Sequence, residues 1–275
     1  SRIGAKITTK TMEIQQHRHQ SQFTNEGTLS AEHTLRVNTS QFLNSDLGTI
    51  ASGDLIVDCG DKYTNAGRLR AINLVIESPV LDIIAGSVEA SKSKFTAEKM
   101  LNRANLVQNQ LDMSTEVLQN DGSIDANRGT INAAKFINSK GGRITSADIT
   151  INCTDNCTTS GKIRAGNVGI QASVFEVTSG CVEAENVNIN ARDFRNKANM
   201  QQNHLTISTN ILQNSGIMEA NSGVINSEEF VNNSAINVGH FSFKSNRFKN
   251  NAGSTINAER TDIQSRKFFE NYGTV

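Results

Sequence analysis

Four cysteines and five histidines are the side chains whose chemistry could extend beyond packing. Cys153 and Cys157 flank Thr-Asp-Asn, a triplet typical of a turn, so we expect a disulfide across a corner of the fold, with free thiols as the main alternative. A zinc site is a weaker alternative, because no second cysteine or histidine pair has suitable spacing. His17 and His19 would share one face of a strand, but two ligands alone make a weak metal site. We therefore predict no metal and no cofactor.

The charge balance excludes several classes of partner. The 275 residues carry 27 basic and 27 acidic side chains, so there is no electrostatic footprint for nucleic acid or for an acidic membrane surface. No apolar run approaches the roughly 20 residues that a membrane-spanning helix needs. The glycines stand too far apart to form a nucleotide-binding loop. We predict no nucleic-acid partner and no membrane insertion.

The element that recurs is a glycine followed by an aliphatic residue two positions later and a small residue two positions after that. Gly27-Thr-Leu29-Ser-Ala31 shows the pattern, and it returns every 17 to 21 residues. Asn105, Ala198 and Ser234 are expected to fill the place where the glycine is missing. The predicted repeat glycines are Gly27, Gly48, Gly67, Gly86, Gly122, Gly142, Gly161, Gly180 and Gly216.

Each repeat also carries an apolar-x-Asn unit just before its glycine and an aliphatic-x-aliphatic pair after it. Phe23-x-Asn25 is an example of the first, and Leu35-x-Val37 of the second. Equivalent asparagines should lie one above another, about 4.8 Å apart, and hydrogen-bond as a ladder. The predicted ladder residues are Asn25, Asn44, Asn65, Asn120, Asn138, Asn196, Asn214, Asn232, Asn250 and Asn271.

Every apolar step within a repeat is two residues, which is the period of a strand and not of a helix. Three short strands in about 19 residues cannot form a free-standing sheet, but they can form one turn of a coil with its apolar faces toward the axis. The sequence therefore predicts an all-β parallel β-helix of about fourteen turns with three short strands each. We expect one β-helical domain over residues 1–275. The single proline agrees, because proline removes a donor from a strand ladder.

Two other functions of β-helices fit less well. A glycan-cleaving β-helix needs carboxylates converging at the same strand position on consecutive turns. The outward row Arg70, Glu89, Asp125, Thr145, Arg164 instead mixes charges, as does its neighbour. Ice binding would need a flat row of threonines, which these charged rows exclude. We predict no catalytic residues and no enzyme activity.

The repeat resembles that of a known family. Phe23-Thr-Asn25-Glu-Gly27-Thr-Leu29-Ser-Ala31 and Leu212-Gln-Asn214-Ser-Gly216-Ile-Met218-Glu-Ala220 are similar to the haemagglutinin repeats of filamentous haemagglutinin and the contact-dependent inhibition exoproteins. The likeness extends from about Phe23 onward. The chain departs from the family in having only one Gly-Gly pair, at Gly141-Gly142, and no evident secretion domain or toxin module.

The resemblance implies a right-handed coil and a shaft of a two-partner-secreted filament on the surface of a Gram-negative bacterium, extending a receptor-binding or toxic region. It also implies an outer-membrane transporter as partner, besides flanking repeats and a target-cell receptor. A second hypothesis is that this segment itself binds the receptor, through turns near Ala85 to Val117 that lose the Gly and Asn register. Because Val275 stops two residues beyond Gly273, inside a repeat, we expect an excised piece of a longer filament.

Overall fold

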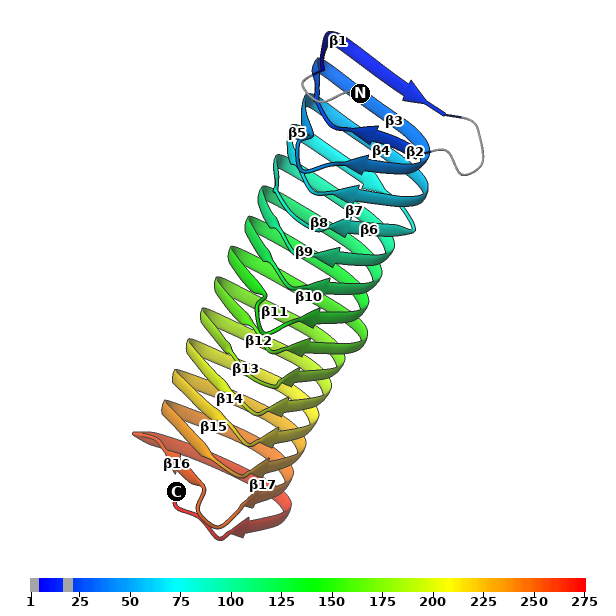
Figure 1. Ribbon diagram of the computed structural model, residues 1–275. Helices are drawn as coiled ribbons and strands as arrows, with labels where there is room; N and C mark the ends of the chain where they lie inside the picture. Colours follow the sequence, from blue (N-terminus) through cyan, green and yellow to red (C-terminus); the bar gives the residue numbers. More distant parts are fainter. Residues whose placement is uncertain (1–4, 17–21) are drawn as a thin grey trace. The chain divides into compact units, whose positions relative to one another are not determined.

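The computed structural model describes residues 5–16 and 22–275, and the chain divides into two compact units, residues 1–133 (unit 1) and 134–275 (unit 2). In each unit the chain winds in stacked turns made almost entirely of strand (Figure 1). The described residues contain no helix, and the turns number about 14 with a spacing of about 19 residues. The predicted parallel β-solenoid is confirmed.

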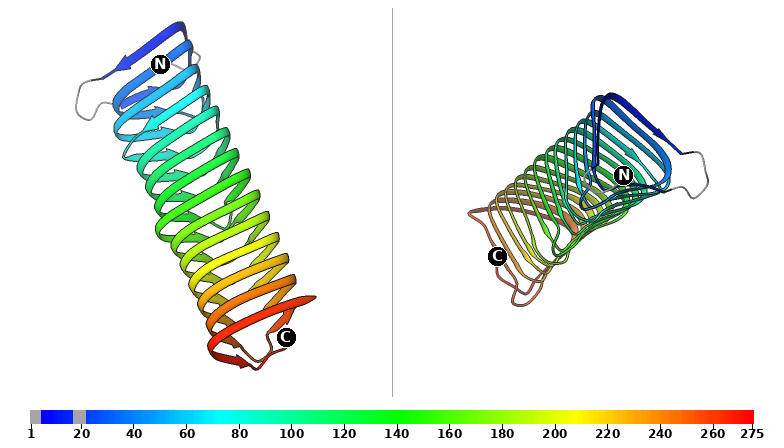
Figure 2. Two further views of the ribbon diagram at one scale, coloured as in Figure 1. Left: turned by 180° about the vertical axis from the view of Figure 1, so that it is seen from behind. Right: turned by 45° about the horizontal axis from the view of Figure 1, so that its top comes forward.

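Unit 1 contains eight complete strands that pair in parallel, each turn on the next (Figure 2). A ninth strand, β9 (Ser123–Asn138), begins in unit 1 and ends in unit 2. The eight are β1 (Lys6–Gln15), β2 (Gln22–Asn25), β3 (Thr28–Asn44), β4 (Thr49–Asn65), β5 (Arg68–Glu77), β6 (Val80–Ile83), β7 (Ser87–Asn102) and β8 (Asn105–Asn120).

Unit 2 repeats the arrangement with strands that pair in chain order from β10 to β15 and then with β16 and β17. Its strands are β10 (Arg143–Thr159), β11 (Lys162–Val177), β12 (Cys181–Asn196), β13 (Asn199–Asn214), β14 (Ile217–Asn232), β15 (Ala235–Asn250), β16 (Thr255–Asn257) and β17 (Arg260–Asn271).

Most turns consist of one strand of 16 or 17 residues that bends at two corners. In the β12–β13 pair, Glu185 and Arg192 are left out of the residue register. They mark the two corners and divide the turn into three paired segments. The three predicted short strands are therefore the three straight segments of one bent strand. The corners stay extended because their neighbours on both sides remain hydrogen-bonded to the adjacent turn.

The core of each unit is the interior of its coils. Along β13 the side chains alternate between buried and exposed, so that alternate residues face the interior, and the reversal at each corner keeps the same face inside. The buried positions there are Met200, Gln202, Leu205, Ile207, Thr209, Leu212 and Asn214. Because the register is in phase, like residues stack on like residues, as at Met200 and Met218.

Aromatic rings form short rows beside the predicted apolar-x-Asn units. In unit 1 the ring of Phe42 lies 5.2 Å from that of Phe23 on one side and 5.2 Å from that of Tyr63 on the other. In unit 2 Phe248 continues such a row between Phe230 and Phe269, with centroid distances of 5.4 and 5.0 Å. These spacings are within the range in which aromatic pairs attract beyond simple burial.

The single proline lies in the turn of unit 1 that follows β4. That turn is divided into two strands at its second corner. β5 ends at Glu77 and β6 begins at Val80, with Ser78 and Pro79 between them. Pro79 has no amide hydrogen to donate, but its carbonyl oxygen accepts from the amides of Glu98 and Lys99 in the next turn. The stacking therefore continues across the break.

Candidate functional site

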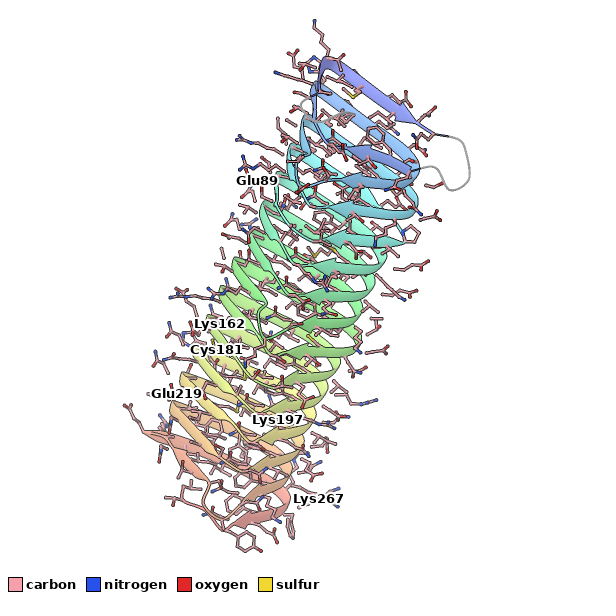
Figure 3. The ribbon with its side chains drawn as sticks, viewed as in Figure 1. Glu89, Lys162, Cys181, Lys197, Glu219 and Lys267 are labelled. Carbon is pink, nitrogen blue, oxygen red and sulfur yellow. The ribbon has the colours of Figure 1, made fainter. Side chains whose placement is uncertain are left out.

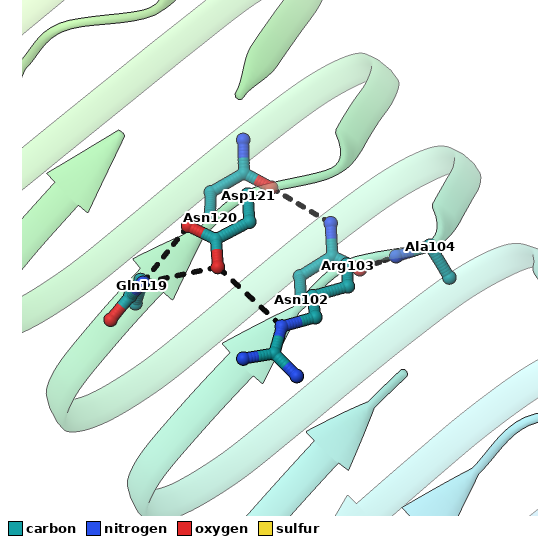
Figure 4. A network of polar contacts seen from close by, with 6 residues as sticks. All are labelled: Asn102, Arg103, Ala104, Gln119, Asn120 and Asp121. Atoms are coloured by element: carbon teal, nitrogen blue, oxygen red, sulfur yellow. Dashed lines mark hydrogen bonds and ion pairs between the residues drawn. The ribbon is translucent and has the colours of Figure 1, made fainter. Parts of the chain in front are cut away.

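The asparagines of the repeat form a buried side-chain stack at one corner of the coil. In unit 1 the Nδ2 of Asn25 donates to the Oδ1 of Asn44, and Asn44 donates in the same way to Asn65, both at 2.8 Å. The stack resumes two turns later, where Asn102 donates to Asn120 at 2.8 Å (Figure 4). All five side chains are fully buried.

Unit 2 carries the same stack over more turns. Asn138 donates to the hydroxyl of Thr159 at 3.1 Å, which takes the place of an asparagine. After one aliphatic residue, Val177, the stack runs from Asn196 to Asn271 without a break. Its members in that run are Asn196, Asn214, Asn232, Asn250 and Asn271.

Several of these amides also bond to the backbone at their own corner. The Oδ1 of Asn25 accepts from the backbone amide of Gly27 at 3.2 Å, and its Nδ2 approaches the carbonyl oxygen of Thr49 at 3.4 Å. Asn196 makes the equivalent bonds with Ala198 and Ile217. Both the donor and the acceptor of these amides are therefore used within the coil, so the stack holds turns together and presents nothing to a ligand.

One member of the stack, Asn102, is not among the predicted residues, although Met100-x-Asn102-x-Ala104 has the spacing of the repeat. The glycine place in that turn belongs to Ala104 and not to Asn105, because Ser87 pairs with Asn105. The prediction that the turns near Ala85 to Val117 lose the asparagine register is therefore wrong. Between Asn65 and Asn102 the stack is interrupted by one residue, Ile83.

The repeat glycines are required mainly by the close approach of successive turns. A Cβ atom on Gly67 would lie 2.1 Å from the carbonyl oxygen of Gly48, far inside contact distance. Gly86 and Gly180 add a second reason, since their φ angles of 74° and 75° lie in the left-handed region that other residues avoid. Gly142 belongs to the same row, and its carbonyl oxygen accepts from Lys162.

The cysteine pair flanks a bulge of β10. Cys153 and Cys157 are both buried free thiols, and the register to β11 shifts between Cys153 and Asn156. Burial, followed by the hydrogen bond to Cys153, raises the pKa of Cys157 well above its ordinary value. The two thiols are neighbours, as the spacing suggested, and the disulfide between them stays a prediction.

The other cysteines are not poised for nucleophilic chemistry. Burial, with a smaller contribution from the Asp58 carboxylate, raises the pKa of Cys59 to about 12. Burial also raises the pKa of Cys181, whose thiol donates to Glu183 at 3.2 Å. A thiol is a nucleophile only as the thiolate, so both stay unreactive near neutral pH.

No cluster of three or more potential metal ligands occurs among the described residues. His17 and His19 lie outside the described residues, and His204 bonds instead to the hydroxyl of Ser222 at 2.7 Å. The part of the chain that the structure describes contains no helix long and apolar enough to span a bilayer.

Comparison with known proteins identifies the repeat. The family model described as haemagglutinin repeat matches residues 8–73, 83–168 and 163–275. The gap at 74–82 contains Pro79, where β5 and β6 are separate strands. No curated protein and no solved structure matches the chain.

Proposed function

The chain belongs to the filamentous haemagglutinin repeat family, and from this premise we propose that it is a shaft segment of a bacterial surface filament. The family is structural and adhesive, and its members are secreted or exposed at the cell surface. In this role the segment extends a receptor-binding or toxic region away from the cell. The proposal includes anchoring at the Gram-negative outer membrane through a dedicated transporter, and flanking repeats of the same filament on either side.

The observation that supports a shaft most directly is the in-phase stacking of turns. In the β13–β14 pair every segment of the turn is hydrogen-bonded to its equivalent one turn later, from Asn199↔Ile217 to Asn214↔Asn232. Each turn therefore offers to the next turn the same row of backbone hydrogen-bonding groups that the previous turn offers to it. A structure of this kind adds length in whole turns without needing a new interface.

The proposal is tested by changing the length of the shaft within the intact filament on the bacterial surface. Residues 196–213 form one whole turn, because Asn196 pairs with Asn214, and their removal joins Arg195 directly to Asn214. We expect attachment to target cells to be kept, because a passive spacer tolerates a shorter length. Loss of attachment in a variant that still folds and reaches the surface would refute a purely passive role.

A second candidate function is that the segment itself binds a partner. It is favoured by a groove on the surface of unit 2, whose lining includes Glu183, Glu185 and Glu219. The shaft proposal covers two roles for the filament, that of an adhesin and that of a toxin carrier in contact-dependent inhibition. Mixing filament-bearing bacteria with target cells distinguishes them, because an adhesin only binds the target cells and a toxin carrier also inhibits their growth.

A further inference from the structure

Another groove, of about 380 Å³, opens on the surface of unit 2 at the second corner of its coils. Three of its lining residues, Asn190, Ser208 and Asn226, lie in register on the consecutive strands β12, β13 and β14. Asn210, at the corner of β13, lines it as well. Successive turns are about 4.8 Å apart, so a polar side chain returns at that interval along the groove. We call this site the amide groove.

The amide side chains of this groove are available to a ligand. Asn190, Asn210 and Asn226 are exposed, and none of the three side chains has a hydrogen-bond partner within the described part of the chain. Outward asparagines near the first corner differ, since the Nδ2 of Asn186 donates to the Oδ1 of Asn167 at 2.7 Å. Each free amide in the groove therefore offers one acceptor and two donors to a ligand.

The strip of surface beside the amide groove carries no charge. Two residues before the row of Asn190 lies the row of Asn188, Thr206 and Val224 on the same three strands. Neither row contains an acidic or a basic side chain in these turns. The corresponding rows of unit 1 carry charges of both signs, at Arg36, Asp58, Glu77, Lys94 and Asp112. The uncharged strip is therefore particular to these turns and not a general property of the coil.

The charged side chains of unit 2 lie away from the strip of free amides. Glu228, Lys244 and Arg266 line the groove only in its last turns, on β14, β15 and β17, and they include both signs. Lys162 and Glu219 lie together on another flank of unit 2, which the first segment of the coil forms (Figure 3). A charged ligand group would therefore lose hydration among the amides without gaining an opposite charge. The amide groove thus favours an uncharged ligand.

We propose that the amide groove binds an uncharged glycan chain. Each sugar hydroxyl both donates and accepts a hydrogen bond, as the free amides and the hydroxyl of Ser208 do. A chain of identical sugars presents these groups at a regular interval, which suits turns that repeat about every 4.8 Å. The lining contains no aromatic side chain, so the affinity rests on many hydrogen bonds and should rise with the length of the glycan.

A second copy of the chain fits this surface less well. The uncharged strip and the corner beside it extend about 14 Å along the three turns and about 14 Å across them, which is about 200 Å². A stable interface between proteins buries roughly 800 Å² on each partner. An extended glycan, in contrast, is held by a strip only a few residues wide. We therefore take a glycan as the occupant.

The test is affinity electrophoresis of the whole 275-residue chain in gels that contain a soluble polysaccharide. Hydroxyethyl cellulose, galactomannan and glycol chitin are the uncharged probes, and dextran sulfate is the charged comparison. We expect at least one uncharged probe to retard the chain, and the retardation to persist at about 0.5 M salt, because no ion pair is involved. The double variant N190A/N226A should weaken this binding about tenfold, since the hydrogen bonds of two amides are lost.

The double variant N38A/Q110A is the matched control. Asn38 and Gln110 are exposed amides on β3 and β8 of unit 1, so the control removes the same chemical groups away from the amide groove. It should leave binding within about twofold of the unchanged chain. All four substituted side chains are exposed, so both variants should fold with an unchanged thermal midpoint. Equal losses in the two variants would show general adhesion to surface amides and overturn the proposal.

Three further outcomes would also overturn the proposal. Retardation by dextran sulfate alone, abolished by salt, would assign the surface to a charged ligand. An unchanged mobility in every gel would show that the groove binds no glycan. Self-association of the chain without glycan, measured by sedimentation and lost in N190A/N226A, would assign the surface to a second copy. A failure here would leave the shaft proposal intact, since that rests on attachment after removal of a whole turn.

Discussion

At the scale of single residues, the fold depends on polar groups that are buried and fully paired. The asparagine stack places uncharged amides in the coil interior, where an amide within a run, such as Asn44, accepts from the asparagine of the turn before it and donates to the asparagine of the turn after it. A side chain in the middle of such a row has two neighbours that lose a partner when it is removed. The buried thiol of Cys59 is a different case, because burial raises its pKa and so keeps the thiol protonated and uncharged.

Asn214→Ala should lower the free energy of unfolding by roughly 2–4 kcal/mol, because it deprives both Asn196 and Asn232 of a buried hydrogen bond. Asn233→Ala is the control, since Asn233 is exposed and should change stability by less than about 0.5 kcal/mol. The comparison is made by urea unfolding followed by circular dichroism. Equal effects of the two substitutions would show that the stack adds nothing beyond surface hydrogen bonds.

Cys59 should make the stability of the chain depend on alkaline pH. Its pKa is raised from 9.0 to about 12 in the folded state, so the folded thiol stays protonated while the unfolded one ionises. The stabilisation is complete below pH 9 and falls by about 1.4 kcal/mol per pH unit between pH 9 and 12. Cys59→Ala should show a shallower fall in its unfolding midpoint over this range. Identical slopes for the two proteins would contradict the assignment.

At the scale of the strand, the corners decide which substitutions a turn accepts. Ile83 interrupts the asparagine stack between Asn65 and Asn102, and its side chain is fully buried. Cys153 and Cys157 lie on either side of a bulge, where β10 carries more residues than β11. At Ile83 only the residue type differs from the repeat, and the strand pairing continues in register. At the bulge the pairing shifts by one residue and is regular again from Asn156 onward.

Ile83→Asn should be tolerated far better than an ordinary burial of an amide, because Asn65 and Asn102 lie in register on either side to bond with it. Ile76→Asn is the matched control, since Ile76 is equally buried but stacks between Val57 and Phe95. We expect the control to cost about 3 kcal/mol or more and Ile83→Asn less than half of that. Chemical denaturation of both variants tests the difference, and equal costs would contradict it.

Mild oxidation should join Cys153 and Cys157, with loss of two hydrogens seen by mass spectrometry of the peptide that contains both. Closing so short a loop should stabilise the folded chain by about 2 kcal/mol. Cys157→Ser is the control, which should show no gain in thermal midpoint under the same oxidant. An unchanged mass in the oxidised wild type would exclude the disulfide.

At the scale of the whole molecule, the unit of construction is one complete turn. Stability in such a chain is a sum over turns and over the interfaces between neighbouring turns, so a change that keeps the register is local and one that shifts it is not. The same reasoning explains why the family model can match the chain in three consecutive blocks without a single defining site.

Removing residues 196–213 should leave a folded solenoid, because Asn214 then continues from Arg195 in the place of Asn196. Removing only residues 196–204 should disrupt unit 2, because the apolar and polar faces of every later strand in that turn would fall out of phase. Circular dichroism and resistance to proteolysis distinguish the two. A half-turn deletion as stable as the whole-turn deletion would contradict a construction in complete turns.

The amino-acid sequence by itself determined the solenoid, the length of its turn and most of the asparagine stack. It could do so because a step of two within a turn and a return after about 19 residues are properties of the chain order alone, as in Phe23-x-Asn25 and Leu212-x-Asn214. Only the tertiary structure decided which positions coincide between turns. It assigned the glycine place to Ala104, added Asn102 to the stack and left the buried amide of Gln202 without a hydrogen-bond partner among the described residues, whereas Gln108 donates to Val88. Small differences in turn length and in corner geometry decide these contacts, and a degenerate repeat does not record them.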